Sequence, residues 1–327
     1  RIFDNVFYEN LQSHEIYFWD DIIFNMSNTD IIFSFYNNLS AIGQGLLPKI
    51  FSDPDNVTWE YYNGKKWINI DSVQETELGV RIKFKGSSVP TKVLDKESRF
   101  LRCKFKKLPE SDIKVTSVKY KSVSDYIPAD SFFADESELS ENDFYPFDEE
   151  YNMYNRFSIV SDEAFTKKGS TIEIVAGVQF VKIKTNMKIP GKKYKSIMSD
   201  IDFADLEPGD IKIERVKWEY WNGTGWARLE TFKGGDEFFT LKEEKISERV
   251  LKFKCPEDME STSIGSAKGY AIRSRIVKMN DRFDFYSNFI TPYIHDLKIK
   301  YSYENSEHQF NSLIVKTDLE SNVINLS

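Results

Sequence analysis

The chain has 327 residues, of which 40% are hydrophobic and 29% charged, a balance typical of a globular protein long enough to bury the cores of two domains. Its formal net charge of −8 disfavours a general nucleic-acid binder, and the sequence holds no run of about 18 apolar residues that would predict a membrane span. Two cysteines, Cys103 and Cys255, are too few for a disulfide framework and indicate a reducing compartment. The sequence begins at Arg1, so we expect it to be a piece of a longer chain.

The stretch "VTWEYYNGKKWINID", residues 57–71, predicts a β-hairpin. Asn63 and Gly64 favour the positive φ angles of a tight primed turn, and aromatic and β-branched residues flank them. With a two-residue loop, one face would carry Trp59 and Tyr61 and the other Glu60, Tyr62 and Trp67. A longer loop would change this register.

Apolar and polar residues alternate along many short runs. In "RIKFKG", residues 81–86, Ile82 and Phe84 face away from the lysines, and "VLKFKC", residues 250–255, repeats the pattern. Such a period of two is typical of strands with one face in a core. No segment longer than about ten residues keeps a helical period, except "KKYKSIMSDIDFADL", residues 192–206, which indicates a short helical turn. We therefore predict an all-β fold.

An acidic and aromatic stretch follows the first half of the chain. Residues 126–160 show little periodicity, but their many Phe and Tyr side chains favour an ordered linker that packs against the domains. The predicted anchors of this linker form one box, Phe144, Tyr145, Pro146 and Phe147.

The hairpin phrase then recurs as "VKWEYWNGTGWARLE", residues 216–230. Trp59 and Trp218 are 159 residues apart, as are Trp67 and Trp226, a spacing that fits duplicated domains better than a solenoid. An arginine-bearing strand follows each phrase, with Arg102 in the first copy and Arg273 in the second. We predict two tandem Ig-like β-sandwich domains of similar plan. The expected boundaries are 1–125 for the first sandwich, 126–160 for the linker, 161–304 for the second sandwich and 305–327 for a tail or the start of a further element.

Several of these motifs together resemble the baseplate assembly proteins of phage-like contractile injection systems, relatives of the phage baseplate J protein. The resemblance is carried by the Phe-Tyr-Pro-Phe box at 144–147, the Ser-Asp-Glu-Ala-Phe box at 161–165 and the Trp-Glu-Tyr-Trp-Asn-Gly hairpin at 218–223. It implies a structural subunit of the baseplate wedge without catalytic activity. The chain departs from the pattern at Asp148, where the family has Gly, and at Tyr62, which matches Trp221 of the second copy.

Catalytic and metal-binding signatures are sparse. His14, His295 and His308 are isolated from one another and from the cysteines, and the acidic run "ADESELSEND" lacks the order of a calcium loop. No phosphate loop or nucleophile elbow is present. We therefore expect no cofactor, no metal and no enzymatic activity. A hydrolase with two carboxylates in a cleft stays open as an alternative.

The residues that we expect to matter are structural or interaction residues, six in the hairpins besides the box at 144–147: Trp59, Tyr61, Trp67, Trp218, Tyr220 and Trp226. Core or inter-domain packing is the first interpretation of these aromatics, a protein–protein surface the second and a sugar-binding platform the third. The expected partners are other baseplate wedge subunits, with no nucleic acid, membrane or small-molecule substrate. The expected location is the bacterial cytoplasm during assembly and then a virion or phage-tail-like particle. The alternative function is a carbohydrate- or receptor-binding module.

Overall fold

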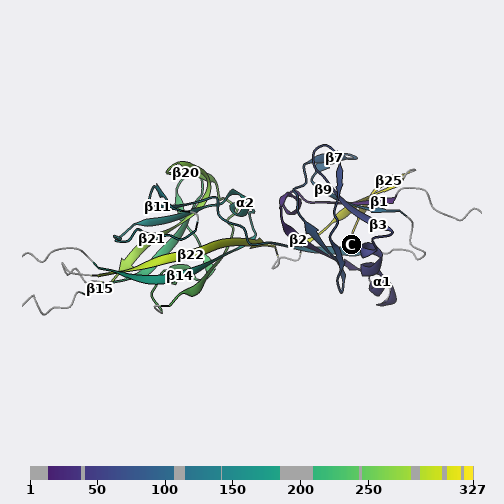
Figure 1. The fold of residues 1–327 in the computed structure, drawn as a ribbon. Helices are drawn as coiled ribbons and strands as arrows, with labels where there is room; N and C mark the ends of the chain where they lie inside the picture. Colours follow the sequence, from purple (N-terminus) through teal and green to yellow (C-terminus); the bar gives the residue numbers. More distant parts are fainter. Residues whose placement is uncertain are drawn as a thin grey trace, which may run out of the picture. The chain divides into compact units, whose positions relative to one another are not determined.

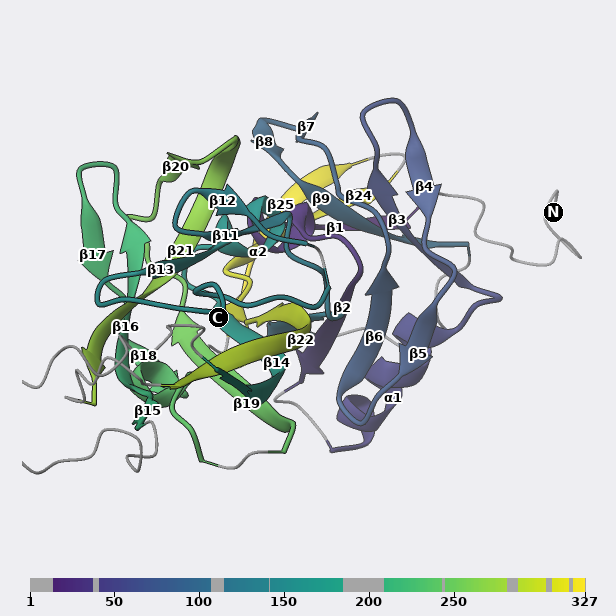
Figure 2. The same cartoon turned by 60° about the vertical axis from the view of Figure 1, so that its left-hand side comes forward.

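Strands dominate the computed structural model, which describes residues 14–37, 41–106, 115–140, 142–184, 209–242, 245–280, 288–303, 308–317 and 320–326. Strands make up 57% of the structure and helices 7%, so the all-β prediction is confirmed. The chain divides into two compact units: unit 1 comprises Arg1–Asp125 and Ser302–Ser327, and unit 2 comprises Tyr126–Tyr301. Figures 1 and 2 show their strands from two sides.

Unit 1 contains two antiparallel sheets. The first has the order β25-β24-β1-β9-β3-β4, and the second has the order β10-β2-β6-β5, with β23 beside β10. Its first-sheet strands are β1 (His14–Trp19), β3 (Val57–Tyr62), β4 (Trp67–Asn69), β9 (Phe100–Phe105), β24 (Ser312–Thr317) and β25 (Ser321–Asn325). Its second-sheet strands are β2 (Thr29–Tyr36), β5 (Val73–Glu75), β6 (Gly79–Phe84), β10 (Ser117–Ser124) and β23 (His308–Gln309). A small hairpin of β7 (Thr91–Val93) and β8 (Lys96–Ser98) and a 3-10 turn η1 (Ile23–Asn25) complete the unit together with helix α1 (Ala41–Ser52).

The core of unit 1 joins its two sheets through aromatic rings. Phe18 on β1 lies 5.1 Å from Phe33 on β2 and 5.5 Å from Trp59 on β3, as measured between ring centroids. All three side chains are buried. The alternation read from residues 81–86 is confirmed here, because Ile82 and Phe84 are fully buried.

Helix α1 was not predicted, because no segment longer than about ten residues had a convincing helical period. The 12-residue helix contains Pro48 and two glycines, which weaken the sequence signal. The last turn of the helix packs against β2 through Phe51, whose ring stacks on that of Phe35 with centroids 4.0 Å apart. Tertiary burial therefore stabilises a helix of low intrinsic propensity. The other predicted helical segment, residues 192–206, lies outside the described residues.

Unit 2 repeats this plan. One sheet has the order β12-β11-β13-β21-β16-β17, with β20 paired to β21, and the other has the order β18-β19-β14-β22, with β15 beside β22. The first-sheet strands are β11 (Ser131–Ala134), β12 (Ser137–Glu138), β13 (Arg156–Val160), β16 (Ile213–Trp221), β17 (Trp226–Arg228), β20 (Ser261–Ile264) and β21 (Ala267–Met279). The second-sheet strands are β14 (Thr171–Ile183), β15 (Asp210–Ile211), β18 (Thr231–Lys233), β19 (Ser247–Lys254) and β22 (Asn288–Ser302), whose last residue belongs to unit 1. Helix α2 (Asp162–Phe165) and the 3-10 turn η3 (Gly235–Glu237) lie between strands.

The strand orders of the two units correspond. The order β24-β1-β9-β3-β4 of unit 1 matches β11-β13-β21-β16-β17 of unit 2, and β10-β2-β6-β5 matches β22-β14-β19-β18. The two units differ in chain order, because β24 and β25 follow all other strands of unit 1 whereas β11 and β12 precede all other strands of unit 2.

Two of the expected boundaries differ from the structure. Residues 126–160 do not form a linker, because they supply β11, β12 and β13 to a sheet of unit 2. Residues 305–327 do not form a separate tail, because β24 and β25 extend the first sheet of unit 1 by pairing beside β1. In β11 and β13 every residue after the first is buried, so these strands lack the alternation of a strand with one face in water.

Candidate functional site

Both tryptophan phrases form hairpins, as predicted, but with a longer loop. Tyr62 pairs with Trp67, so the first loop holds the four residues 63–66. The side chain of Asn63 accepts hydrogen bonds from the backbone N of Lys65 and Lys66 at 3.0 and 2.9 Å. Gly64, with φ of 92°, is the one residue of this loop in the left-handed region. The turn is therefore held by the asparagine side chain, and the predicted two-residue primed turn is wrong.

The loop of the second hairpin has the same hydrogen bonds at the corresponding positions. Asn222 accepts from the backbone N of Thr224 and Gly225 at 3.1 and 2.9 Å, and Gly223 has φ of 88°. The side-chain faces are unaffected by the longer loop, because two extra residues preserve the alternation of a strand.

One tryptophan of each hairpin anchors the core. Trp59 and Trp218 are 1% and 2% exposed. The indole N–H of Trp59 donates to the carbonyl oxygen of Phe51 in α1 at 2.9 Å, and that of Trp218 donates to the carbonyl oxygen of Gly235 in η3 at 3.0 Å. Each tryptophan therefore links its sheet to a neighbouring helical segment, α1 in unit 1 and η3 in unit 2. The indole N–H, the one polar group of the ring, has a hydrogen-bond acceptor in both cases.

The opposite face of the first sheet of unit 1 carries a cluster of buried and half-buried polar and aromatic side chains, which we call the unit-1 cluster: Glu15, Tyr17, Glu60, Trp67 and Arg102. The guanidinium of Arg102 lies 4.3 Å from the centre of the Trp67 ring. It donates from Nε to Glu60 at 2.6 Å and from Nη1 to Glu15 at 3.2 Å. The ring of Trp67 also contacts Tyr17 edge-on, with centroids 5.6 Å apart.

Unit 2 carries the matching arrangement, the unit-2 cluster: Glu219, Trp226, Arg273 and Arg275. Arg273 lies 4.0 Å from the centre of the Trp226 ring and donates to Glu219 at 2.8 Å. Glu219 also accepts from Nη2 of Arg275 at 2.7 Å. Glu60 is the cross-strand partner of Arg102, and Glu219 is that of Arg273, so the repeat predicted from sequence holds at the level of strand register.

The two clusters differ in charge balance. Burial on its own would lower the pKa of Arg102, but the hydrogen bond with Tyr17 and the carboxylates of Glu60 and Glu15 outweigh it and raise this pKa. Burial lowers the pKa of Arg273, and the neighbouring guanidinium groups of Arg156 and Arg275 add to this effect against the single carboxylate of Glu219. The arginine of unit 1 thus lies in a compensated site, whereas that of unit 2 lies among like charges.

The box at residues 144–147 packs inside unit 2. Phe144 lies 4.8 Å from Phe132 between ring centroids, and Phe147 lies 5.0 Å from Phe239. Pro146 is buried beside them, and Tyr145 contacts Tyr293 edge-on at 4.7 Å. The box therefore lies in the interior of a sandwich and does not anchor a linker.

The two remaining hairpin residues are partly exposed. The ring of Tyr61 contacts Phe84 edge-on at 5.1 Å between centroids, and the hydroxyl of Tyr220 donates to Asp258 at 2.9 Å. Sequence reasoning missed the glutamates and arginines of both clusters as site residues. Their signal was an arginine at the matching position of each copy, in Leu101-Arg102-Cys103 and in Ile272-Arg273-Ser274.

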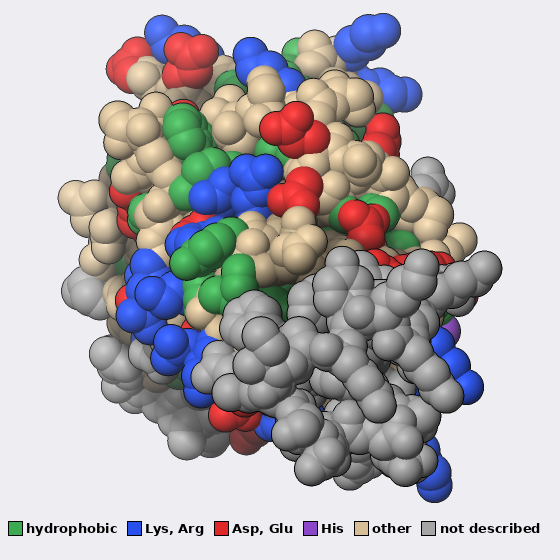
Figure 3. Space-filling model, turned by 90° about the vertical axis from the view of Figure 1, so that its left-hand side faces the viewer, with side chains coloured by type: hydrophobic (Ala, Val, Ile, Leu, Met, Phe, Trp, Pro, Cys, Tyr) green, Lys and Arg blue, Asp and Glu red, His purple; other side chains and the backbone are tan. Residues whose placement is uncertain are grey.

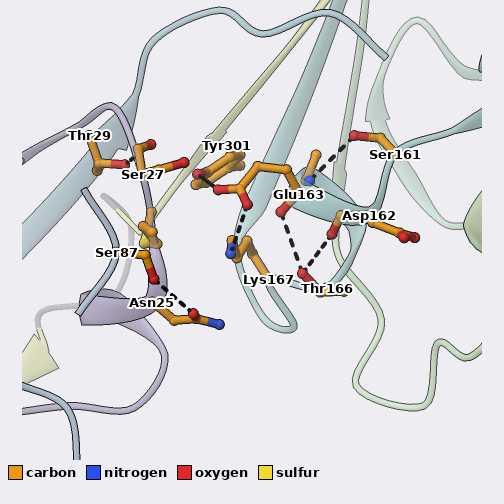
Figure 4. A network of polar contacts seen from close by, with 12 residues as sticks. Asn25, Ser27, Thr29, Ser87, Ser161, Asp162, Glu163, Thr166, Lys167 and Tyr301 are labelled. Atoms are coloured by element: carbon orange, nitrogen blue, oxygen red, sulfur yellow. Dashed lines mark hydrogen bonds and ion pairs between the residues drawn. The ribbon is translucent and has the colours of Figure 1, made fainter. Parts of the chain in front are cut away.

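A polar network surrounds the short helix α2 (Figure 4). Ser161 caps this helix by accepting from the backbone N of Ala164 at 3.4 Å. Glu163 accepts from the hydroxyl of Tyr301 and pairs with the almost fully buried ammonium of Lys167 at 3.4 Å. These contacts satisfy buried polar groups inside unit 2 and leave α2 fixed.

Residues suited to catalysis or metal binding are dispersed. In the described part of the chain, no group of three or more His, Cys, Asp or Glu side chains could hold a metal ion. His295 contacts Asp143 at 3.0 Å and Gln179 at 3.3 Å, while Cys103 and Cys255 are buried free thiols. The side chain of His308 lies outside the described residues.

Unit 1 has a cavity of about 280 Å³ between its sheets. Phenylalanine, valine, leucine and isoleucine side chains form most of its lining, and the lining contains one carboxylate, Glu15. That carboxylate is paired with Arg102 at 3.2 Å. The described residues of this lining thus hold no second carboxylate of the kind that a glycosidase pair needs.

No known family model matches the chain, and no curated protein is detectably similar to it. Among the described residues, no helix combines the length and the apolar character that spanning a bilayer would need.

Proposed function

We propose that this chain is a structural, non-enzymatic assembly module, built of two Ig-like β-sandwiches of common plan, in the baseplate of a phage tail or contractile injection particle. The observation that carries the proposal is the repeated, largely buried cluster of tryptophan, arginine and glutamate on the outer face of one sheet in each unit. Each cluster locks a hairpin to the neighbouring strand by a cation–π contact and a charge-assisted hydrogen bond. Such a face is stiff, which suits a part that transmits force.

The motifs that resemble baseplate assembly proteins occupy structural positions. The Phe-Tyr-Pro-Phe box fills the interior of unit 2, and the Ser-Asp-Glu-Ala-Phe box forms the cap and body of α2. The tryptophan hairpins supply Trp59 and Trp218 to the two cores. Motifs that serve packing rather than chemistry favour a scaffold protein, and its partners would be other wedge subunits of the same particle.

A carbohydrate- or receptor-binding module is the second candidate, because Trp67 and Trp226 lie on the solvent side of their sheets. Arginine guanidinium groups cover one face of each ring at 4.3 and 4.0 Å. Aromatic neighbours contact the same rings, Tyr62 at 5.7 Å and Trp221 at 5.8 Å. A sugar would have to compete with these contacts, so the geometry favours the scaffold.

Tryptophan fluorescence separates the two candidates. For the scaffold, we expect blue-shifted emission from the buried Trp59 and Trp218 that does not change on adding bacterial polysaccharides. A red shift or quenching by one polysaccharide would contradict the scaffold and support the receptor-binding module.

Deletion of the coding sequence in the source bacterium tests the baseplate role. We expect electron micrographs of the induced culture to show no complete contractile particles, and a plasmid copy to restore them. Normal particles in the deletion strain would overturn the proposal.

A further inference from the structure

The solvent-side face of the first sheet of unit 2 carries a row of three basic side chains. Arg156 on β13 is the cross-strand partner of Arg275 on β21, which is in turn the partner of Lys217 on β16. Like charges directly opposite each other destabilise a sheet. Figure 3 shows Lys and Arg side chains gathered beside hydrophobic ones on the side of the molecule turned to the viewer.

The corresponding row of unit 1 is free of this conflict. There, Glu15 on β1 is the partner of Lys104 on β9, which is in turn the partner of Thr58 on β3. The same scaffold thus accommodates an acid, a base and a neutral residue at these positions. The sandwich itself therefore does not require three bases in unit 2.

Carboxylates of unit 2 only partly compensate its row. Asp135 pairs with Arg156 at 2.9 Å, and Glu219 is shared between Arg273 and Arg275. Lys217 forms no ion pair with any described residue, and Nε of Arg275 is buried without a hydrogen-bond partner. Four cations thus face two carboxylates on a chain whose formal net charge is −8.

An exposed aromatic side chain borders the row. Tyr154 is 61% exposed, and the guanidinium of Arg275 lies 5.8 Å from the centre of its ring. Its φ of 73° is in the left-handed region, which a bulky residue rarely adopts. Its backbone N donates to the carbonyl oxygen of Ile276 at 3.0 Å and so holds this conformation. A strained backbone that presents an aromatic ring to solvent beside incompletely compensated cations is typical of a binding surface.

We propose that the row of Arg156, Arg275 and Lys217, with Tyr154 at its border, binds an acidic segment of a partner protein. This inference deepens the proposed function and rests on it, because it names the chemistry of the partner subunit at one face. Carboxylates of the partner complete the compensation that Asp135 and Glu219 begin, and they accept charge-assisted hydrogen bonds from the guanidinium groups and from the ammonium of Lys217. A nucleic acid fits less well, since the overall negative charge of the chain repels a long polyanion.

Fluorescence anisotropy with a labelled glutamate-rich peptide of about 12 residues tests the proposal at about 50 mM and about 300 mM salt. A peptide with glutamine at every glutamate position is the neutral control, and heparin and single-stranded DNA are the competing polyanions. The test variant is Lys217→Glu, which breaks no ion pair. The matched control is Lys254→Glu, an exposed residue on β19 in the other sheet of unit 2, which receives the same charge change.

We expect the acidic peptide to bind in a salt-dependent manner, and we expect Lys217→Glu to weaken it at least about fivefold while Lys254→Glu changes it less than about twofold. Equal effects of the two variants, or no binding at low salt, would overturn the inference. Tighter binding of heparin or DNA at the same face would overturn the choice of an acidic protein. These failures leave the baseplate proposal standing, because particle assembly in the deletion strain is measured separately.

Discussion

Replacing Glu219 by glutamine would remove the one carboxylate that the two arginines of the unit-2 cluster share. Glu219 is 9% exposed and accepts from Arg273 at 2.8 Å and from Arg275 at 2.7 Å. Removing one partner of a buried ion pair costs about 3–5 kcal/mol. Because the two arginine side chains are 15% and 30% exposed, water screens part of this loss, and we expect about 2 kcal/mol.

The equivalent change in unit 1, Glu60→Gln, provides the matched comparison. Arg102 keeps Glu15 at 3.2 Å, so the free energy of unfolding should fall by only about 1 kcal/mol. Urea unfolding followed by tryptophan fluorescence and scanning calorimetry would measure both variants, with the transitions of the two units fitted separately. For a unit of this size, about 2 kcal/mol corresponds to a fall of about 4–8 °C in Tm.

Added salt offers a second readout of the same reasoning. Glu219→Gln leaves unbalanced guanidinium groups that repel one another, so salt should restore part of the lost stability of this variant and little of that of Glu60→Gln. A loss in Glu60→Gln as large as in Glu219→Gln, or no salt effect on either, would refute the account of the two clusters.

Three further changes test other parts of the structure. Gly234→Ala should destabilise unit 2 by at least about 2 kcal/mol, because Gly234 has φ of 83° and an added Cβ would overlap the carbonyl oxygen of Val250. The control is Gly225→Ala, whose added Cβ has no atom within 4 Å. Its free energy of unfolding in the same urea titration should change by less than about 0.5 kcal/mol. Burial, with the carboxylate of Glu257 adding to it, raises the pKa of Cys255 from 9.0 to about 12, so the folded state holds this proton longer than the unfolded state. Stability should therefore fall by up to about 1.4 kcal/mol per pH unit between these two values, and Cys255→Ala should flatten this slope in unfolding titrations; an unchanged slope would contradict the assignment. Tyr154→Asn should raise stability by about 1 kcal/mol, since asparagine tolerates positive φ, and should weaken binding of the acidic peptide; a loss of stability would show that the tyrosine conformation is not strained.

The sequence was informative where side chains alternate in and out of a core. The period of two identified Ile82, Phe84, Leu251 and Phe253 as buried strand residues, and all four are fully buried. Asn-Gly marked the position of both hairpins but not the loop length, because the asparagine side chain can hold turns of different size. Such local signals fix where a strand is and leave its connections open.

Long-range pairing could not be predicted in the same way. The partners of β11, β13 and β24 are set by which apolar face each short strand can cover, and that depends on segments far away in sequence. The two arginine clusters could not be predicted for the same reason. Arg102 and Arg273 were visible as repeated residues, but their role depends on Glu60 and Glu219 across the strand and on the tryptophan above. The basic row of unit 2 became visible only once strand register placed Arg156 beside Arg275 and Lys217.

The late position of β24 and β25 in the sequence determines the order in which the two units can fold during synthesis. All of unit 2, Tyr126–Tyr301, leaves the ribosome before these two strands do. Until then β1 can pair with β9 on one side, but its other edge has no partner strand. The partners of Ile16 and Tyr17 on that edge, Val315 and Ile314, have not yet been synthesised. Unit 2 can therefore fold while unit 1 is still incomplete. A nascent chain stalled before residue 312 would carry a folded unit 2 and, in unit 1, an unpaired edge strand that is prone to aggregate.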